Sequence, residues 1–265
     1  KMLFNMITYL LQNIDLYEKN HGKKFKSINL VENKELVINS VDNWILQYTN
    51  KFITKVHNDM SKYELFNIVK YIEDIVDKLS RWYLKLNKLR FSDSDYIGIN
   101  VLYYCLYNLI VTIAPFTPFM SESIYQKIKK YSYEEELESV HFIQMNKNIW
   151  NDNSDLIEPM NNLYKVVNGS RVLRNKMNKT CLKLPVKKLI IVNSNVKIIE
   201  GIKYLNNLIE NEVNVLSIEY DTNETKYVNY KLEINPKLGK ILKNKMKMVR
   251  NYLEKLTDKD VNDIV

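Results

Sequence analysis

From about residue 42 to residue 128, apolar side chains recur at helical spacing in long stretches, and only short polar or proline-containing breaks separate them. The second helix of the chain is expected to carry one such set: Trp44, Ile45, Tyr48, Phe52, Val56 and Met60. The fourth helix carries a more apolar one: Ile99, Leu102, Tyr103, Leu106, Leu109, Ile110 and Ile113. Apolar faces of this kind must be buried against other helices. Long helices with short connections favour an antiparallel bundle.

Capping and breaking residues predict where these helices begin and end. The first expected helix covers 2–19 and is ended by His21-Gly22, the second is capped by Asp42, and the third runs from about Tyr63 to Arg90. The fourth follows the turn Ser92-Asp93-Ser94-Asp95 and stops at Ala114-Pro115. The fifth is started by Thr117-Pro118, with Thr117 as N-cap, and the sixth is opened by Glu158-Pro159. Small polar side chains before a helix and proline in its first turn are the usual start signals. The residue before a proline disfavours helix, which predicts the stop at Ala114.

Near residue 180 the pattern changes from helical to mixed. Lys188–Val192, Val213–Tyr220 and Lys226–Ile234 are strand-like, residues 196–210 are helical, and a basic helix follows Asn235-Pro236. The predicted fold class is therefore mainly α, an antiparallel helical bundle followed by a small α+β C-terminal domain. The predicted divisions are a linking helix and loop over 1–40, the bundle over 41–180 and the α+β domain over 181–265.

The chain lacks the residue patterns of common catalytic and cofactor sites. Its five glycines form no phosphate-binding loop, and its two cysteines, Cys105 and Cys181, are not spaced as a zinc motif. The three histidines are far apart, no apolar run is long enough to span a bilayer, and no secretory signal opens the chain. We therefore expect no catalytic residue, no metal and no cofactor in this chain, no membrane partner, and a reducing, cytoplasmic compartment. Because Lys1 already lies at the start of an apolar-periodic run, we also expect a fragment of a longer polypeptide.

Three clusters of cations predict a polyanionic partner in a chain of net charge +8. The first holds Lys78, Arg81, Lys85, Lys88 and Arg90, with Trp82 and Tyr83 interleaved; the second holds Arg171, Arg174, Lys176 and Lys179; the third holds Lys240, Lys243, Lys247 and Arg250. Cations at steps of three and four fall on one side of a helix. Such rows neutralise phosphates without reading sequence, and each row could equally be a solvated face. Trp82 is expected to be a core anchor.

Several segments resemble the anticodon-binding region of class I aminoacyl-tRNA synthetases. They are Val41-Asp42-Asn43-Trp44-Ile45-Leu46, Ala114-Pro115-Phe116-Thr117-Pro118-Phe119 with Ile124-Tyr125-Gln126, Ser139-Val140-His141-Phe142, and Leu79 to Arg90. Within that class the Trp82-Tyr83 pair is similar to the isoleucine enzymes. Arg171-Val172-Leu173-Arg174, Leu184 to Val192 and Leu238-Gly239-Lys240 resemble the C-terminal part of their eukaryotic or archaeal type. Departures are Arg81 where the family often has Asn, Lys85 and Lys88 where it has Arg, Leu89 within its basic run, and Asn146 near a usual Pro.

This resemblance implies a region that binds the anticodon stem-loop of tRNA(Ile), in a parent enzyme that attaches isoleucine with ATP and Mg. It implies that the catalytic and editing domains of the same chain lie outside these residues and act as partners. The implied RNA contacts are Lys78, Arg81, Lys85, Lys88, Arg90, Arg171, Arg174, Lys240 and Lys243. Lysine keeps the charge of arginine but not its bidentate fork. Two alternatives stay open: the equivalent region of a valine enzyme, and a scaffold whose basic helices meet an acidic protein. The oligomeric state is not predicted.

Overall fold

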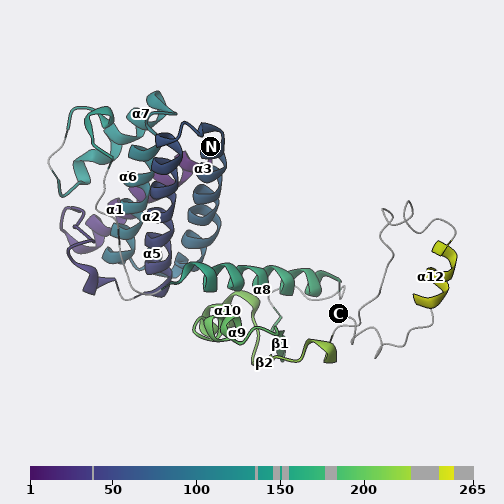
Figure 1. Ribbon diagram of the computed structural model, residues 1–265. Helices are drawn as coiled ribbons and strands as arrows, with labels where there is room; N and C mark the ends of the chain where they lie inside the picture. The colour runs from purple at the N-terminus through teal and green to yellow at the C-terminus, as the bar shows by residue number, and fades with distance from the viewer. Residues whose placement is uncertain are drawn as a thin grey trace. The chain divides into compact units, whose positions relative to one another are not determined.

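The computed structural model describes residues 1–37, 39–134, 137–145, 150, 155–176, 184–227 and 245–253. The chain divides into two compact units, residues 1–161 and residues 162–265. Each unit is described by itself (Figure 1). Residues 1–40 belong to the same unit as the helices that follow them, and the division at residue 161 lies within a helix. The predicted domain boundaries at residues 40 and 180 stay predictions.

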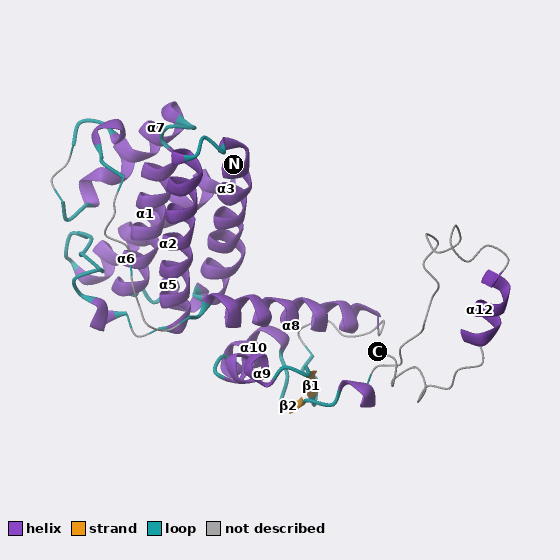
Figure 2. Cartoon of the chain, in the orientation of Figure 1, coloured by secondary structure: helices purple, strands orange, loops and turns teal. Residues whose placement is uncertain are grey.

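The described part of the first unit is built from helices and short helical turns. The α-helices are α1 (Met2–His21), α2 (Ser40–Ser61), α3 (Ile68–Asp77), α4 (Leu84–Leu86), α5 (Lys88–Ser92), α6 (Tyr96–Ile113) and α7 (Pro118–Ile128). The 3₁₀ turns are η1 (Lys34–Leu36), η2 (Leu65–Asn67), η4 (Lys129–Tyr131) and η5 (Val140–Phe142), and η3 (Lys78–Tyr83) is a π-helical segment. The long helices α1, α2, α3 and α6 lie alongside one another (Figure 2). The mainly helical fold is as predicted.

Helix α6 forms the centre of the first unit. It contacts α1, α2, α5 and α7. The side chains of Ile99, Leu102 and Leu106 are fully buried. Each buried leucine or isoleucine contributes about 1.5–3 kcal/mol relative to exposure, so this helix is the main apolar contribution to the bundle.

The same helix corrects one expectation. By length and composition α6 could cross a membrane, whereas the sequence argument found no apolar run of sufficient length. In the structure 78% of this segment is buried inside the protein. The core helix of a globular unit meets the same criteria, so α6 is weak evidence for a membrane span.

Several predicted helix ends agree with the structure. Gly22 ends α1 in the left-handed conformation with φ 63°, where glycine carries no Cβ penalty. Asp95 is the N-cap of α6, and its carboxylate accepts hydrogen bonds from the backbone amides of Ile97 and Gly98. Pro118 opens α7 as predicted.

One predicted cap is wrong, and another is correct in position but makes no capping hydrogen bond. The N-cap of α2 is Asn39, whose side chain accepts a hydrogen bond from the Val41 amide at 2.8 Å. Asp42 lies inside the first turn and is fully buried. Thr117 does stand at the N-cap position of α7, but its hydroxyl bonds to the Ile113 carbonyl and to Ser121 and does not cap the helix.

The segment predicted as one helix from Tyr63 to Arg90 is composite. A 3₁₀ turn precedes α3, a π-helical segment joins α3 to α4, and Asn87 interrupts the chain before α5 with φ −101° and ψ 13°. A π-helix places about one more residue in each turn than an α-helix. Within this segment Leu79, Trp82 and Tyr83 are buried.

Helix α8 (Ile157–Lys176) begins in the first unit and continues into the second. The second unit then adds β1 (Leu189–Val192), α9 (Val196–Lys203), α10 (Asn206–Val213), β2 (Ile218–Asp221), the 3₁₀ turn η6 (Glu224–Lys226) and α12 (Met246–Leu253). The two strands pair in parallel, with Leu189 opposite Ile218 and Val192 opposite Asp221. A parallel pair requires a crossover, which α9 and α10 provide.

The strand predicted over Val213–Tyr220 begins later than expected, because α10 continues to Val213 and Asn214 ends it in the left-handed conformation. Residues 228–234 of the strand predicted over Lys226–Ile234 lie outside the described residues.

The buried thiol of Cys105 gives a first testable prediction. Cys105 on α6 is fully buried, and burial raises the pKa of its thiol to about 12. Because the thiolate is the reactive form, we expect this thiol to react with a water-soluble disulfide reagent at pH 8 only when the fold opens. The measurement is labelling of a Cys181→Ser variant, followed by absorbance, in buffer and in urea. Labelling in buffer as fast as in urea would contradict it.

Candidate nucleic-acid interface

Three predicted RNA-contacting side chains are exposed along one helical stretch of the first unit. Arg81 lies in η3, Lys85 in α4 and Lys88 in α5, and all three are exposed, while Lys78 is half-buried. We call Arg81, Lys85 and Lys88 the basic face. They lie four and three residues apart in sequence, on segments separated by the end of the π-helix and by the break at Asn87.

Arg81 is partly neutralised within its own segment. Its Nε lies 3.0 Å from the Asp77 carboxylate, four residues earlier, and its side chain is 69% exposed. An exposed pair of this kind contributes at most about 1 kcal/mol and exchanges readily with other partners. Arg81 therefore stays able to turn toward an external anion.

The two aromatic residues interleaved with these cations point inward. Trp82 is 6% exposed and Tyr83 is fully buried, and the ring of Tyr83 packs edge-on against Phe91 at 6.1 Å between centroids. The expectation that Trp82 is a core anchor is confirmed. Neither ring is available to stack on an unpaired base, so the basic face offers charge while the aromatic rings hold it on the core.

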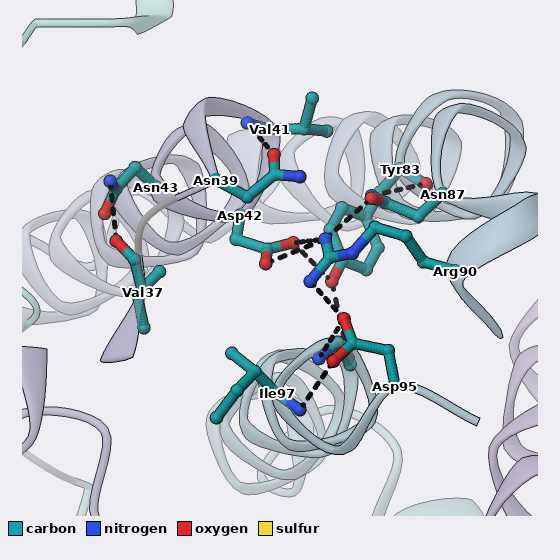
Figure 3. A network of polar contacts seen from close by, with 11 residues as sticks. Val37, Asn39, Val41, Asp42, Asn43, Tyr83, Asn87, Arg90, Asp95 and Ile97 are labelled. Atoms are coloured by element: carbon teal, nitrogen blue, oxygen red, sulfur yellow. Dashed lines mark hydrogen bonds and ion pairs between the residues drawn. The ribbon is translucent and has the colours of Figure 1, made fainter. Parts of the chain in front are cut away.

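Beneath this segment lies a polar network centred on the carboxylate of Asp42 (Figure 3). Arg90 Nη1 donates hydrogen bonds to both carboxylate oxygens of Asp42, at 3.0 Å to Oδ1 and 2.9 Å to Oδ2. The Tyr83 hydroxyl donates to Asp42 Oδ1 at 2.9 Å, and Arg90 Nη1 donates to the side-chain oxygen of Asn87 at 2.8 Å. Arg90 Nη2 also pairs with Asp95, the cap of α6. The network thus ties α2, η3, α5 and α6 together.

The electrostatics of this network favour a formed ion pair. Burial raises the pKa of the Asp42 carboxyl, and Arg90 and the Tyr83 hydroxyl partly offset that rise. Burial lowers the pKa of Arg90, but the carboxylates of Asp42 and Asp95 outweigh it, so the pKa of Arg90 lies above its ordinary value. Burial raises the pKa of Tyr83 as well, which keeps its hydroxyl protonated as a donor. Arg90 is therefore turned into the protein, unlike the three residues of the basic face.

The second predicted cluster also has inward-facing members. Arg171 pairs with Glu212 at 2.7 Å, and Arg174, only 5% exposed, donates to the backbone oxygens of Val213 and Leu184. These bonds hold α8 against the end of α10 within the second unit. Lys176 is exposed, and Lys179 lies outside the described residues.

Most of the third cluster is not described. Lys240 and Lys243 lie outside the described residues, and Lys247 on α12 is exposed. Of the predicted contacts, Arg81, Lys85 and Lys88 are thus exposed on successive segments of the first unit, and Lys240 and Lys243 stay predictions. Among the described residues, no group of three His, Cys, Asp or Glu side chains could hold a metal ion.

The sequence argument missed the role of Asp42, Asn87 and Asp95 as the frame beneath the basic face. One signal was present. Asp42 stands three and four residues before Ile45 and Leu46, so helical spacing puts it on the apolar face of its helix. A carboxylate at such a position requires a buried cation or several donors, since an unpaired buried charge is very costly.

Comparison with known proteins adds a family to this geometry. Residues 42–190 match a family described as the anticodon-binding domain of tRNA ligase. The cytoplasmic isoleucine–tRNA ligase of Schizosaccharomyces pombe is 30% identical over 260 residues, which cover 94% of this chain and 24% of that protein. The cytoplasmic isoleucine–tRNA ligase of Saccharomyces cerevisiae is 30% identical over 242 residues, which cover 85% of this chain and 22% of that protein. The probable cytoplasmic isoleucine–tRNA ligase of Dictyostelium discoideum is 28% identical over 269 residues, which cover 98% of this chain and 25% of that protein. The chain spans about a quarter of the length of the curated relatives it matches.

Proposed function

The chain belongs to the family of anticodon-binding domains of tRNA ligases, and from this we propose that it is the tRNA-binding region of an isoleucine–tRNA ligase. The observation that carries the proposal is the similarity to isoleucine–tRNA ligases along nearly the whole chain, beyond the residues that the family model matches. The parent enzyme would attach isoleucine to tRNA(Ile) in the cytoplasm, with ATP and Mg bound by its catalytic part. This region would supply affinity and orientation and no catalytic group.

The proposal includes a finer architecture and an RNA-contacting surface. We infer an antiparallel bundle of the class I anticodon-binding type, followed by the small α+β domain. The basic face is the part of the first cluster that an RNA backbone can reach, because its three cations are exposed on a segment fastened to the core. Phosphate contacts of this kind position a nucleic acid without reading its bases.

Within this proposal the arginines that are paired inside the protein act as supports. Three arginines already bond to groups of the protein: Arg90 to Asp42, Arg171 to Glu212 and Arg174 to the Val213 oxygen. If they turned toward an RNA, these carboxylate and carbonyl oxygens would lose their partners. Lys78 lies half-buried at the start of the segment. Lys240 and Lys243 stay predicted contacts outside the described residues.

The test is fluorescence anisotropy of labelled tRNA(Ile) with the full 265-residue chain, at two salt concentrations. The matched ligand is the same tRNA with its anticodon replaced, and heparin is the control polyanion. A clear loss of affinity on replacement, at both salt concentrations, is the expected result. Equal affinity for both tRNAs and for heparin would reject anticodon binding and favour a scaffold for acidic partners.

A further inference from the structure

One end of the first unit carries large apolar side chains that are exposed and that take no part in the basic face or its supporting network. Phe119 is 91% exposed, Tyr63 88% and Phe66 73%. We call the following six exposed residues the apolar end: Phe4, Tyr63, Leu65, Phe66, Val69 and Phe119. Single exposed apolar residues are normal on a protein surface, whereas a group of large ones marks an interaction site.

Contacts between the helices place these residues at the same end of the unit. The end of α1 lies beside the start of α6, because Asn20 donates a hydrogen bond to Ser94 at 2.9 Å. The start of α2 lies there as well, because Arg90 joins Asp42 to Asp95. The three helices have 18 to 22 residues and lie alongside one another. The start of α1, the turn from α2 to α3 and the step from α6 to α7 therefore share the opposite end (Figure 1), and the six residues come from these three places.

The backbone of Tyr63 adds an independent observation. Its φ is 60°, in the left-handed region that favours glycine. For a bulky residue this conformation is costly, and burial of the ring does not offset the cost, since the side chain lies in solvent. Unfavourable backbone conformations of this kind cluster at functional sites. The ring of Tyr63 is therefore presented outward for contact with another surface.

The charges around the apolar end favour a protein over a nucleic acid as its partner. Residues 61–73 carry two exposed cations and two exposed acids: Lys62, Lys70, Glu64 and Glu73. Farther along, the carboxylates of Asp74 and Asp77 on α3 stand between this turn and the basic face. An RNA backbone that follows the basic face would be repelled by these acids before it reached the apolar end. An apolar centre with a mixed polar rim is the usual composition of a protein interface.

We propose that the apolar end docks on the part of the parent isoleucine–tRNA ligase that lies outside residues 1–265, against an apolar surface of that part. This inference rests on the proposed function. The chain spans about a quarter of the length of its curated relatives, so most of such a parent lies outside these residues. Any segment of the parent that precedes α1 reaches the unit at this same end. The apolar end would then fix the unit on the parent, and the basic face would stay open to RNA.

The first test is hydroxyl-radical footprinting, read by mass spectrometry, of the full-length ligase and of the 265-residue chain, both without tRNA. Oxidation of Tyr63, Leu65 and Phe66 is expected to be at least about fivefold slower in the full-length ligase, because the centre of an interface excludes water. Leu36 is the matched control for Leu65, since both leucines are about equally exposed and both lie in 3₁₀ turns. Its oxidation should be the same in both proteins.

Equal oxidation of the apolar end in both proteins would overturn the proposal. Protection already present in the 265-residue chain, together with a dimer in sedimentation, would also overturn it and assign the surface to a second copy. Because no tRNA is present, this result is independent of whether the chain binds tRNA(Ile).

The second test is the double variant Tyr63→Gly/Leu65→Ser. Glycine suits the left-handed backbone and both side chains are exposed, so the urea midpoint of the 265-residue chain should not fall. In the full-length ligase the variant should lower kcat/KM for aminoacylation of tRNA(Ile) at least about fivefold, because a loosened unit positions the tRNA poorly. Leu36→Ser should leave kcat/KM unchanged. Weaker binding of tRNA(Ile) by the 265-residue variant would instead place the apolar end in the RNA interface and contradict the proposal.

Discussion

Replacing Arg90 by methionine is expected to lower the free energy of unfolding of the first unit by about 3–5 kcal/mol. Asp42 is fully buried, and Arg90 is its only charged partner among the residues bonded to it in the described structure. Methionine keeps much of the apolar stem of arginine but removes the guanidinium. The loss then arises from a buried carboxylate that keeps only the hydroxyl of Tyr83 as a donor.

Urea unfolding followed by circular dichroism measures this effect, with Arg81→Met as the matched control. Arg81 is a nearby arginine that is largely exposed, and its ion pair within the described residues is with Asp77 at the surface. Its replacement should change stability by no more than about 0.5 kcal/mol. The double variant Asp42→Asn/Arg90→Met should recover part of the loss, because it no longer buries an unpaired charge. A loss below about 1 kcal/mol for Arg90→Met would show that the pair does not hold the bundle together.

Local signals predicted the elements that depend on local chemistry. The apolar period of α6, the cap at Asp95 and the proline that opens α7 are all properties of a few adjacent residues. The small parallel sheet was not predicted as a pair, although β1 was expected at nearly its observed residues. Strand pairing depends on residues about 30 positions apart, and a sequence pattern carries no direct record of it.

The π-helical segment was beyond reach of the same reasoning. An uninterrupted α-helix would give the same row of cations and the same apolar face with Leu79, Trp82 and Tyr83, so the pattern carries no sign of the extra residue per turn.

The candidate site shows the same limit in its arginines. By proximity in sequence, Arg90 was grouped with Lys85 and Lys88, and Arg174 with Arg171 and Lys176. Whether a cation turns inward depends on a partner far away in sequence: Asp42 is 48 residues from Arg90, and the Val213 oxygen is 39 residues from Arg174. The sequence could therefore predict where cations cluster, but not which of them form ion pairs or hydrogen bonds inside the protein.

The second large effect is expected from replacing the exposed lysines of the basic face. The double variant Lys85→Glu/Lys88→Glu is expected to lower the affinity for tRNA(Ile) by at least about tenfold at low salt, because two phosphate contacts become repulsive. The slope of log affinity against log salt should flatten by about 1.4–1.8, which is about 0.7–0.9 for each of the two lost contacts. Both lysines are exposed and lie outside the network around Asp42, so the stability of the bundle should be unchanged.

The matched control is Lys23→Glu/Lys24→Glu, which makes the same change in net charge at two exposed lysines after α1. Anisotropy over a series of salt concentrations compares the two variants with the unaltered chain. If net charge alone attracts the tRNA, both variants lose the same affinity, and the basic face has no special role. If the basic face meets the phosphates, only the Lys85/Lys88 variant loses the steep salt dependence. Unchanged binding of that variant, with an intact fold, would remove Lys85 and Lys88 from the interface and leave the contacts to residues such as Lys240 and Lys243.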